Sequence, residues 1–111
     1  MGKIGKETIE ALNYFTQNGG YFSLATGRTR PATAAYRPLL PCNAPGVYLN
    51  GAILCDESTE TIVYMEGLDD RAKELARRVM KEFPHIGIEV FLLDKSYVCN
   101  LNEITREHFS N

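Results

Sequence analysis

One segment carries most of the structural information in this 111-residue chain: Tyr21-Phe22-Ser23-Leu24-Ala25-Thr26-Gly27-Arg28. Its first five residues are nearly all apolar, which is typical of a strand buried on both faces and therefore of a parallel sheet. The next three residues form a turn at the carboxyl end of that strand, where open α/β sheets bind their ligands. The segment therefore predicts a buried strand at residues 21–25 that leads directly into a candidate binding turn.

The chemistry of this turn suits a phosphate group. The Thr26 hydroxyl can donate to a phosphate oxygen, Gly27 lets the backbone approach closely, and a following helix would present free N–H groups. A cation at Arg28 or Arg30 would add to the attraction. The spacing alone leaves a second interpretation open, in which Thr26 or Thr29 caps a helix, Gly27 makes the turn and the arginines are solvated.

The flanking residues alternate between helix and strand. A first helix is predicted up to Asn18-Gly19-Gly20, which tolerate the left-handed backbone of a helix end. A second helix is predicted from about Arg30 to Leu40, with Pro31 in its first turn, and a second strand at residues 46–49. This order of elements indicates a parallel α/β sheet. The apolar stripe expected on the first helix consists of Thr8, Ala11, Leu12 and Phe15.

The pattern changes at Asn50-Gly51, which is a strong hairpin signal. Residues 52–55 and 61–65 then flank a polar turn. A long helix is predicted from near Leu68 to Pro84, followed by antiparallel strands at residues 87–93 and 97–100, and Asn102 is expected to cap a last helix. The second half of the chain therefore has an α+β layout.

Charge and cysteine content exclude several classes of protein. A net charge of -2 gives no basic excess for binding nucleic acid, and no apolar run is long enough to span a bilayer. Cys42, Cys55 and Cys99 form no Cys-x-x-Cys pair, and neither His85 nor His108 has metal-ligand spacing from a cysteine. The sequence predicts reduced thiols in a cytoplasmic protein, with no partner among nucleic acids or membranes.

The order of three segments resembles the haloacid-dehalogenase-like (HAD-like) superfamily, and most closely its Cof-type branch of phosphatases acting on small phosphorylated metabolites. These segments are residues 8–12, the turn at residues 24–28 and Asn50-Gly51-Ala52-Ile53. Asn50-Gly51-Ala52 resembles the point where that branch leaves its core and enters an inserted cap. The resemblance implies a partial Rossmann-like core (helix-strand-helix-strand) over residues 1–49 and part of an α+β cap over residues 50–111.

The resemblance also implies roles for individual residues. Thr26 would be the second family motif, the hydroxyl that holds the transferring phosphoryl group, and Gly27 would shape the same turn. Arg28 resembles a family arginine with a structural or electrostatic role. Asn50 and Gly51 would lie near the mouth of the site, where the cap hinges; the alternative for this pair is a simple tight turn.

The first family motif, Asp-x-Asp-Gly-Thr, does not occur in the sequence. In the family its first Asp is the nucleophile and its second Asp is the general acid/base. The lysine of the third motif and the acidic residues of the fourth, which hold Mg²⁺, lie beyond the cap. We therefore expect a fragment that begins after the first motif, through a misassigned start, a truncated gene or cleavage. It would have no catalytic residue and no metal ligand of its own, although the family implies Mg²⁺, and it would be inactive alone.

The missing first strand has a consequence for partners. Residues 21–25 would present an unpaired apolar edge, which favours pairing with another chain. We expect a second copy, a swapped element or the missing part of the fold to cover this edge. Two other functions stay open: a non-catalytic oligomerisation or binding module derived from the same fold, and an unrelated small α/β binding domain.

Overall fold

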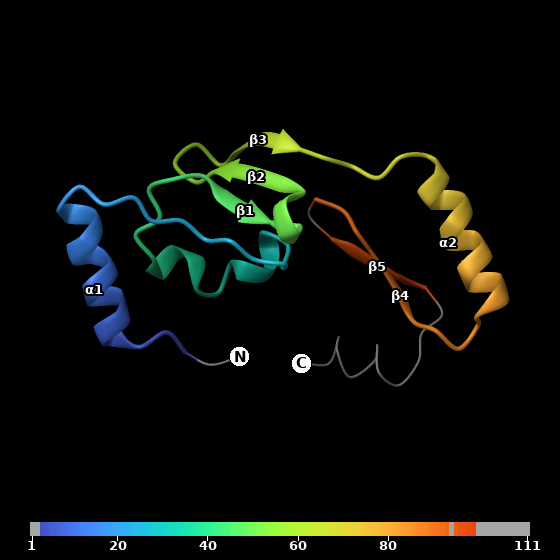
Figure 1. The fold of residues 1–111 in the computed structure, drawn as a ribbon. Helices are drawn as coiled ribbons and strands as arrows, with labels where there is room; N and C mark the ends of the chain where they lie inside the picture. The colour runs from blue at the N-terminus through green and yellow to red at the C-terminus, as the bar shows by residue number, and fades with distance from the viewer. Residues whose placement is uncertain (1–2, 94, 100–111) are drawn as a thin grey trace. The chain divides into compact units, whose positions relative to one another are not determined.

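The computed structural model describes residues 3–93 and 95–99 (Figure 1). The chain divides into two compact units, Met1–Glu66 and Gly67–Asn111. The first contains a three-stranded sheet in the order β1-β2-β3, and the second contains the two-stranded sheet β4-β5. The mixed α/β class is confirmed. This division follows packing within the chain, so the core–cap boundary after residue 49 stays a prediction.

The first helix, α1 (Lys6–Gln17), ends where the sequence predicts. The Asn18 N–H donates to the Tyr14 carbonyl at 3.1 Å, and Gly19 has a φ of +91°, the left-handed conformation expected at a helix end. The predicted apolar stripe is wrong, because Phe15 is 51% exposed and its ring packs over Gly20. The half-buried stripe has the same spacing but is rotated by one residue, and it consists of Ile9, Leu12, Asn13 and Thr16.

The buried strand predicted at residues 21–25 is reduced to a single parallel bridge between Ala25 and Val47. In that bridge the Thr26 N–H donates to the Val47 carbonyl at 2.9 Å. Upstream of it, the Asn43 side chain takes the place of a neighbouring strand, since its amide nitrogen donates to the Gly20 carbonyl at 3.0 Å. The predicted parallel direction is therefore correct at the end of the segment, where the candidate turn begins.

The helix predicted over residues 30–40 is wrong. Two short 3₁₀ helices, η1 (Pro31–Thr33) and η2 (Arg37–Leu39), occupy this range. Pro38 has no N–H to donate, and its ring disfavours the α conformation for Arg37. Residues 29–40, which directly follow the candidate turn, therefore contain no α-helix, and the helix N-terminus that was expected to face a phosphate does not form there.

Both predicted hairpins of the first unit are confirmed. β1 (Gly46–Tyr48), β2 (Ile53–Asp56) and β3 (Thr61–Met65) pair in antiparallel fashion, and the turn η3 (Leu49–Gly51) joins the first two strands. The core of this sheet is small. Its buried apolar members are Tyr48, Ile53 and Cys55.

The second unit contains α2 (Arg71–Glu82), β4 (Ile88–Phe91) and β5 (Ser96–Cys99). The helix begins later than predicted, at Arg71, whose N–H donates to the Asp69 carboxylate at 2.8 Å. The two strands pair in antiparallel fashion, as predicted. The last predicted helix, capped by Asn102, lies outside the described residues. Across residues 3–93 and 95–99, no helix is both long and apolar enough to cross a bilayer.

The turn between β1 and β2 should be sensitive to substitution at Gly51. Its φ is +101°, a conformation that residues with a Cβ rarely adopt. We expect Gly51→Ala to lower the free energy of unfolding of the first unit by about 1–2 kcal/mol, measured by urea unfolding followed at the Ile53 amide. Gly67→Ala is the control, since Gly67 has an ordinary φ and no neighbour within 4 Å of an added Cβ. Equal unfolding midpoints for the two variants would contradict this.

Candidate functional site

Two turns that are distant in the sequence meet at the end of the parallel bridge. These are residues 26–28 and 49–51, which together are called the turn pair below. The Asn50 N–H donates to the Thr26 carbonyl at 3.1 Å, and the Leu49 N–H donates to the Arg28 carbonyl at 3.1 Å. The structure therefore brings together all five residues predicted for the site, namely Thr26, Gly27, Arg28, Asn50 and Gly51.

Within the turn pair, Gly27 allows the closest approach. A Cβ at this position would lie 2.9 Å from Oδ1 of Asn50, so the Asn50 amide lies against the Gly27 backbone. Asn50 has a φ of +57°, the left-handed region that asparagine tolerates better than most residues. A Cβ at residue 27 would require the Asn50 amide to move, and the positive φ at residue 50 favours asparagine over most other residues.

The Thr26 hydroxyl accepts the Arg28 N–H at 3.1 Å. Its own proton has no acceptor within residues 3–93 and 95–99, and the same holds for the Gly27 N–H and the Asn50 side-chain amide. The Arg28 side chain is exposed and makes no hydrogen bond or ion pair within that part of the chain. The turn pair thus carries a cation and several donors with unused capacity, which is the chemistry that an anion requires.

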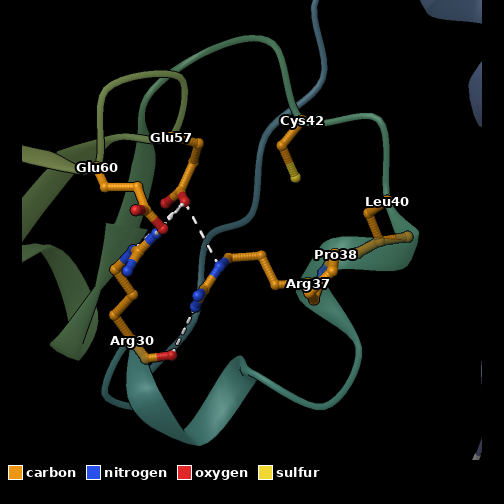
Figure 2. A pocket seen from close by; sticks show the side chains of 7 residues that line it. All are labelled: Arg30, Arg37, Pro38, Leu40, Cys42, Glu57 and Glu60. Atoms are coloured by element: carbon orange, nitrogen blue, oxygen red, sulfur yellow. Dashed lines mark hydrogen bonds and ion pairs between the residues drawn. The ribbon is translucent and has the colours of Figure 1, made fainter.

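Arg30, the other cation proposed from the sequence, is used elsewhere. Figure 2 shows its guanidinium directed at Glu57, with Nη2 donating to Oε2 at 3.0 Å and to Glu60 Oε1 at 3.3 Å. Arg37 reaches the same Glu57 oxygen at 3.5 Å, and the Tyr48 hydroxyl donates to the other oxygen, Oε1, at 2.6 Å. Arg30, Arg37, Tyr48 and Glu57 are called the Glu57 cluster below.

The Glu57 cluster borders a cavity of about 250 Å³. The Glu57 side chain is only 9% exposed, so its charge is separated from most of the solvent. Burial alone would raise its pKa, but the hydrogen bonds from Tyr48 and Arg30 and the two guanidinium charges outweigh burial and hold the pKa below its ordinary value. Burial, together with the bond to Glu57, raises the pKa of Tyr48 to about 12. The cavity is lined by Arg30, Arg37, Pro38, Leu40, Cys42, Glu57 and Glu60.

The three cysteines are free thiols. Burial raises the pKa of both Cys42 and Cys55, which keeps these thiols protonated and makes them poor nucleophiles. No group of three or more His, Cys, Asp or Glu side chains in the described ranges is placed to hold a metal ion. Mg²⁺ is usually held by carboxylates together with phosphate oxygens. Neither half of the turn pair contains Asp or Glu, so the turn pair has no carboxylate ligand to offer Mg²⁺.

Sequence reasoning missed the Glu57 cluster. Arg30 lies in a turn and Glu57 lies in the hairpin between β2 and β3, and no local motif connects them. The sequence shows only that Arg30 and Glu57 each lie in a polar segment next to an apolar strand, and this does not predict that the two side chains pair.

Comparison with known proteins identifies the family to which this mixed α/β fold belongs. The profile of a family described as haloacid dehalogenase-like hydrolase matches residues 1–111. The chain belongs to this family, which confirms the resemblance found in the sequence. No curated protein matches the sequence.

Solved structures show the same fold at low sequence identity. A phosphatase of the HAD superfamily, BT1666 from Bacteroides thetaiotaomicron, is similar with a TM-score of 0.81 at 18% identity, over 97% of this chain and 39% of that one. The HAD subclass IIB sugar phosphatase BT4131 is similar with a TM-score of 0.73 at 23% identity, over 96% of this chain and 41% of that one. This chain therefore spans about two fifths of the length of these structures.

Glu57 should make the first unit sensitive to acid. Its pKa is lower in the folded chain than its ordinary value of 4.5, so the unfolded chain takes up the proton first as the pH falls. The stabilisation is complete above about pH 4.5 and is lost as the pH falls through the folded pKa. The pKa values of Arg30, Tyr48, Cys42 and Cys55 are all raised, so these neighbours of Glu57 stay protonated throughout this range.

Urea unfolding followed at the Ile53 amide, repeated from about pH 6 down to about pH 3, measures this dependence. We expect Glu57→Gln to be less stable than the parent at pH 6 and to lose less stability on acidification. The pKa of Asp56 is also lowered, by hydrogen bonds from Ser58, but Asp56 is present in both proteins and its effect cancels in the comparison. Parallel pH profiles for the two proteins would contradict a role for the Glu57 charge.

Proposed function

We propose that this chain is the phosphate-binding part of a Mg²⁺-dependent HAD-like phosphatase acting on small phosphorylated metabolites such as sugar phosphates. Family membership and the fold shared with a sugar phosphatase support the reaction class. The observation that carries the proposal is the state of the Thr26 hydroxyl. Its oxygen accepts the Arg28 N–H, while its proton has no acceptor among the residues that the structure describes.

In this proposal each residue of the turn pair has its own part. Thr26 donates its free proton to an oxygen of the phosphoryl group, and the Gly27 N–H donates beside it. Arg28 supplies positive charge at the exposed rim of the turn. Asn50 and Gly51, with φ values of +57° and +101°, lie where the chain leaves the core and form the hinge at the entrance to the cap.

The free energies of the available hydrogen bonds predict weak phosphate binding by this chain alone, and the lack of a nucleophile predicts no phosphatase activity. One hydrogen bond to a charged group contributes about 1.5–3 kcal/mol, whereas a millimolar site needs about 4 kcal/mol. The helix that would have added a dipole is replaced by η1, which has three residues. Phosphoryl transfer also needs an in-line nucleophile, and the sequence contains no Asp-x-Asp.

Titration of the 111-residue chain with inorganic phosphate, followed by the amide signals of Gly27, Arg28 and Asn50, tests the proposed site. We expect these signals to shift together with a dissociation constant of about 1–100 mM, and Thr26→Ala to remove the shifts. Thr29→Ala is the matched control, because the Thr29 hydroxyl also accepts a backbone N–H, that of Ala32, but Thr29 lies outside the turn pair. Shifts that survive in Thr26→Ala would contradict the proposed role of Thr26.

A turnover assay with an aryl phosphate and excess Mg²⁺ tests the second part of the proposal. We expect no hydrolysis above background by the chain alone. Hydrolysis that disappears in Thr26→Ala would show that the chain is active by itself, and it would overturn the expectation of inactivity while supporting the site.

A second candidate function is a non-catalytic pairing module. One side of the segment at residues 21–26 faces β1, but the backbone groups of Ser23 and Ala25 make no hydrogen bond within residues 3–93 and 95–99. Tyr21 at its start is 80% exposed. This free edge favours pairing with a second copy of the chain or with another strand.

Sedimentation at micromolar concentration tests the pairing function. It predicts a defined oligomer in which the Ser23 and Ala25 amides are protected from hydrogen exchange. A monomer in which these amides exchange freely would contradict it.

A further inference from the structure

The Glu57 carboxylate bonds at the same time to a residue next to each half of the turn pair, namely Arg30 and Tyr48. Through Oε2 it binds Arg30, which lies two residues after Arg28. Through Oε1 it binds Tyr48, whose chain neighbours Val47 and Leu49 both hydrogen-bond to the backbone of residues 26–28. We propose that Glu57 is a positioning residue, which sets the geometry of the phosphate-binding turn from a distance without contacting the ligand.

The surroundings of Glu57 leave its carboxylate little freedom to move. A Cβ on Gly46 would lie 2.7 Å from Glu57 Oε1 and 2.9 Å from the Tyr48 ring, so the carboxylate and the phenol are packed against the β1 backbone. The hydrogen bonds use both oxygens of the carboxylate. Because the Glu57 carboxylate is tightly packed and hydrogen-bonded, removing it should shift the side chains bonded to it.

The partners of Glu57 are themselves tied to the backbone near the turn. Arg37 donates from Nη1 to the Arg30 carbonyl at 2.8 Å and to the Thr33 hydroxyl at 2.7 Å. The Thr33 hydroxyl in turn donates to the same Arg30 carbonyl at 2.7 Å. The residues that follow the turn are therefore fixed at both the side chain and the carbonyl of Arg30, and Glu57 links this anchor to β1.

Glu60 provides a matched control within the same hairpin. It also pairs with Arg30, at 3.3 Å, but its side chain is 73% exposed, and in the described part of the chain it makes no hydrogen bond or ion pair with Tyr48 or Arg37. Removing the Glu60 charge therefore perturbs Arg30 without breaking the link to β1. This difference separates positioning from a general effect of negative charge near Arg30.

The test compares the parent chain with Glu57→Ala, Glu57→Gln and Glu60→Gln. Amide hydrogen exchange is measured without phosphate at four amides. The Thr26 N–H donates to the Val47 carbonyl, the Asn50 N–H donates to the Thr26 carbonyl, and Ile53 and Tyr64 lie in the sheet. We expect Glu57→Ala to lower protection at Thr26 and Asn50 at least tenfold more than in the sheet. Glu57→Gln, which keeps the acceptor oxygen, should recover part of that loss, and Glu60→Gln should match the parent.

Equal loss of protection at all four amides, or no loss at Thr26 and Asn50, would overturn the inference.

Where Glu57→Ala does not fold, Tyr48→Phe is the second variant, because it removes only the bond to Oε1. It should lower protection at Asn50 by several fold more than at Tyr64, and equal protection ratios would again overturn the inference.

The inference rests on the proposed function, and titration of the same samples with inorganic phosphate distinguishes the two failures. One outcome is a selective loss of hydrogen-exchange protection at Thr26 and Asn50 in Glu57→Ala, combined with no phosphate-induced shift in the parent. This would support the positioning role and contradict the phosphate site. Phosphate-induced shifts that are equal in the parent and in Glu57→Ala, without selective loosening, would support the site and contradict the role of Glu57.

Discussion

The parallel bridge between Ala25 and Val47 is the contact on which the rest of the first unit depends. Two backbone hydrogen bonds form it, from Val47 N–H to the Leu24 carbonyl at 2.8 Å and from Thr26 N–H to the Val47 carbonyl at 2.9 Å. Because they occur at the last residues before the turn, they place residues 26–28 beside residues 49–51. Hydrogen bonds of this kind contribute only about 0.5–1.5 kcal/mol each. A bridge this short needs support from side chains, and the Glu57 cluster provides it.

The sequence predicts local features well and long-range ones poorly. The ends of α1, the hairpins around Asn50-Gly51 and residues 56–60, and the pairing of β4 with β5 all follow from turn residues and from alternation between apolar and polar positions. The helix over residues 30–40 fails because Pro38 breaks it, a signal that is visible in the sequence but was outweighed by Pro31 at the expected start. The strand at residues 21–25 shrinks to one bridge because strand length depends on a neighbour that local sequence does not specify.

The candidate site shows the same division between local and long-range information. All five predicted residues lie in the turn pair. Gly27, Asn50 and Gly51 meet backbone requirements of the turns and Thr26 contributes a hydroxyl, whereas Arg28 is predicted from its charge and from the family resemblance. The same charge argument applies to Arg28 and Arg30, but charge does not indicate where a side chain points: the Arg30 guanidinium pairs with Glu57, while that of Arg28 stays exposed. The two arginines thus have separate parts. The Arg28 guanidinium is exposed and can bind an anion, whereas the Arg30 guanidinium pairs with Glu57 and stabilises the residues after the turn.

A crystal structure of the chain grown with tungstate, a heavy mimic of phosphate, tests the central claim most directly. The account predicts an anion within hydrogen-bonding distance of Thr26 Oγ1 and the Gly27 nitrogen, with Arg28 turned toward it and Arg30 still paired with Glu57. A Thr26 hydroxyl that donates to a protein acceptor, with tungstate bound elsewhere or at Arg30, would contradict the claim that this turn binds the phosphoryl group.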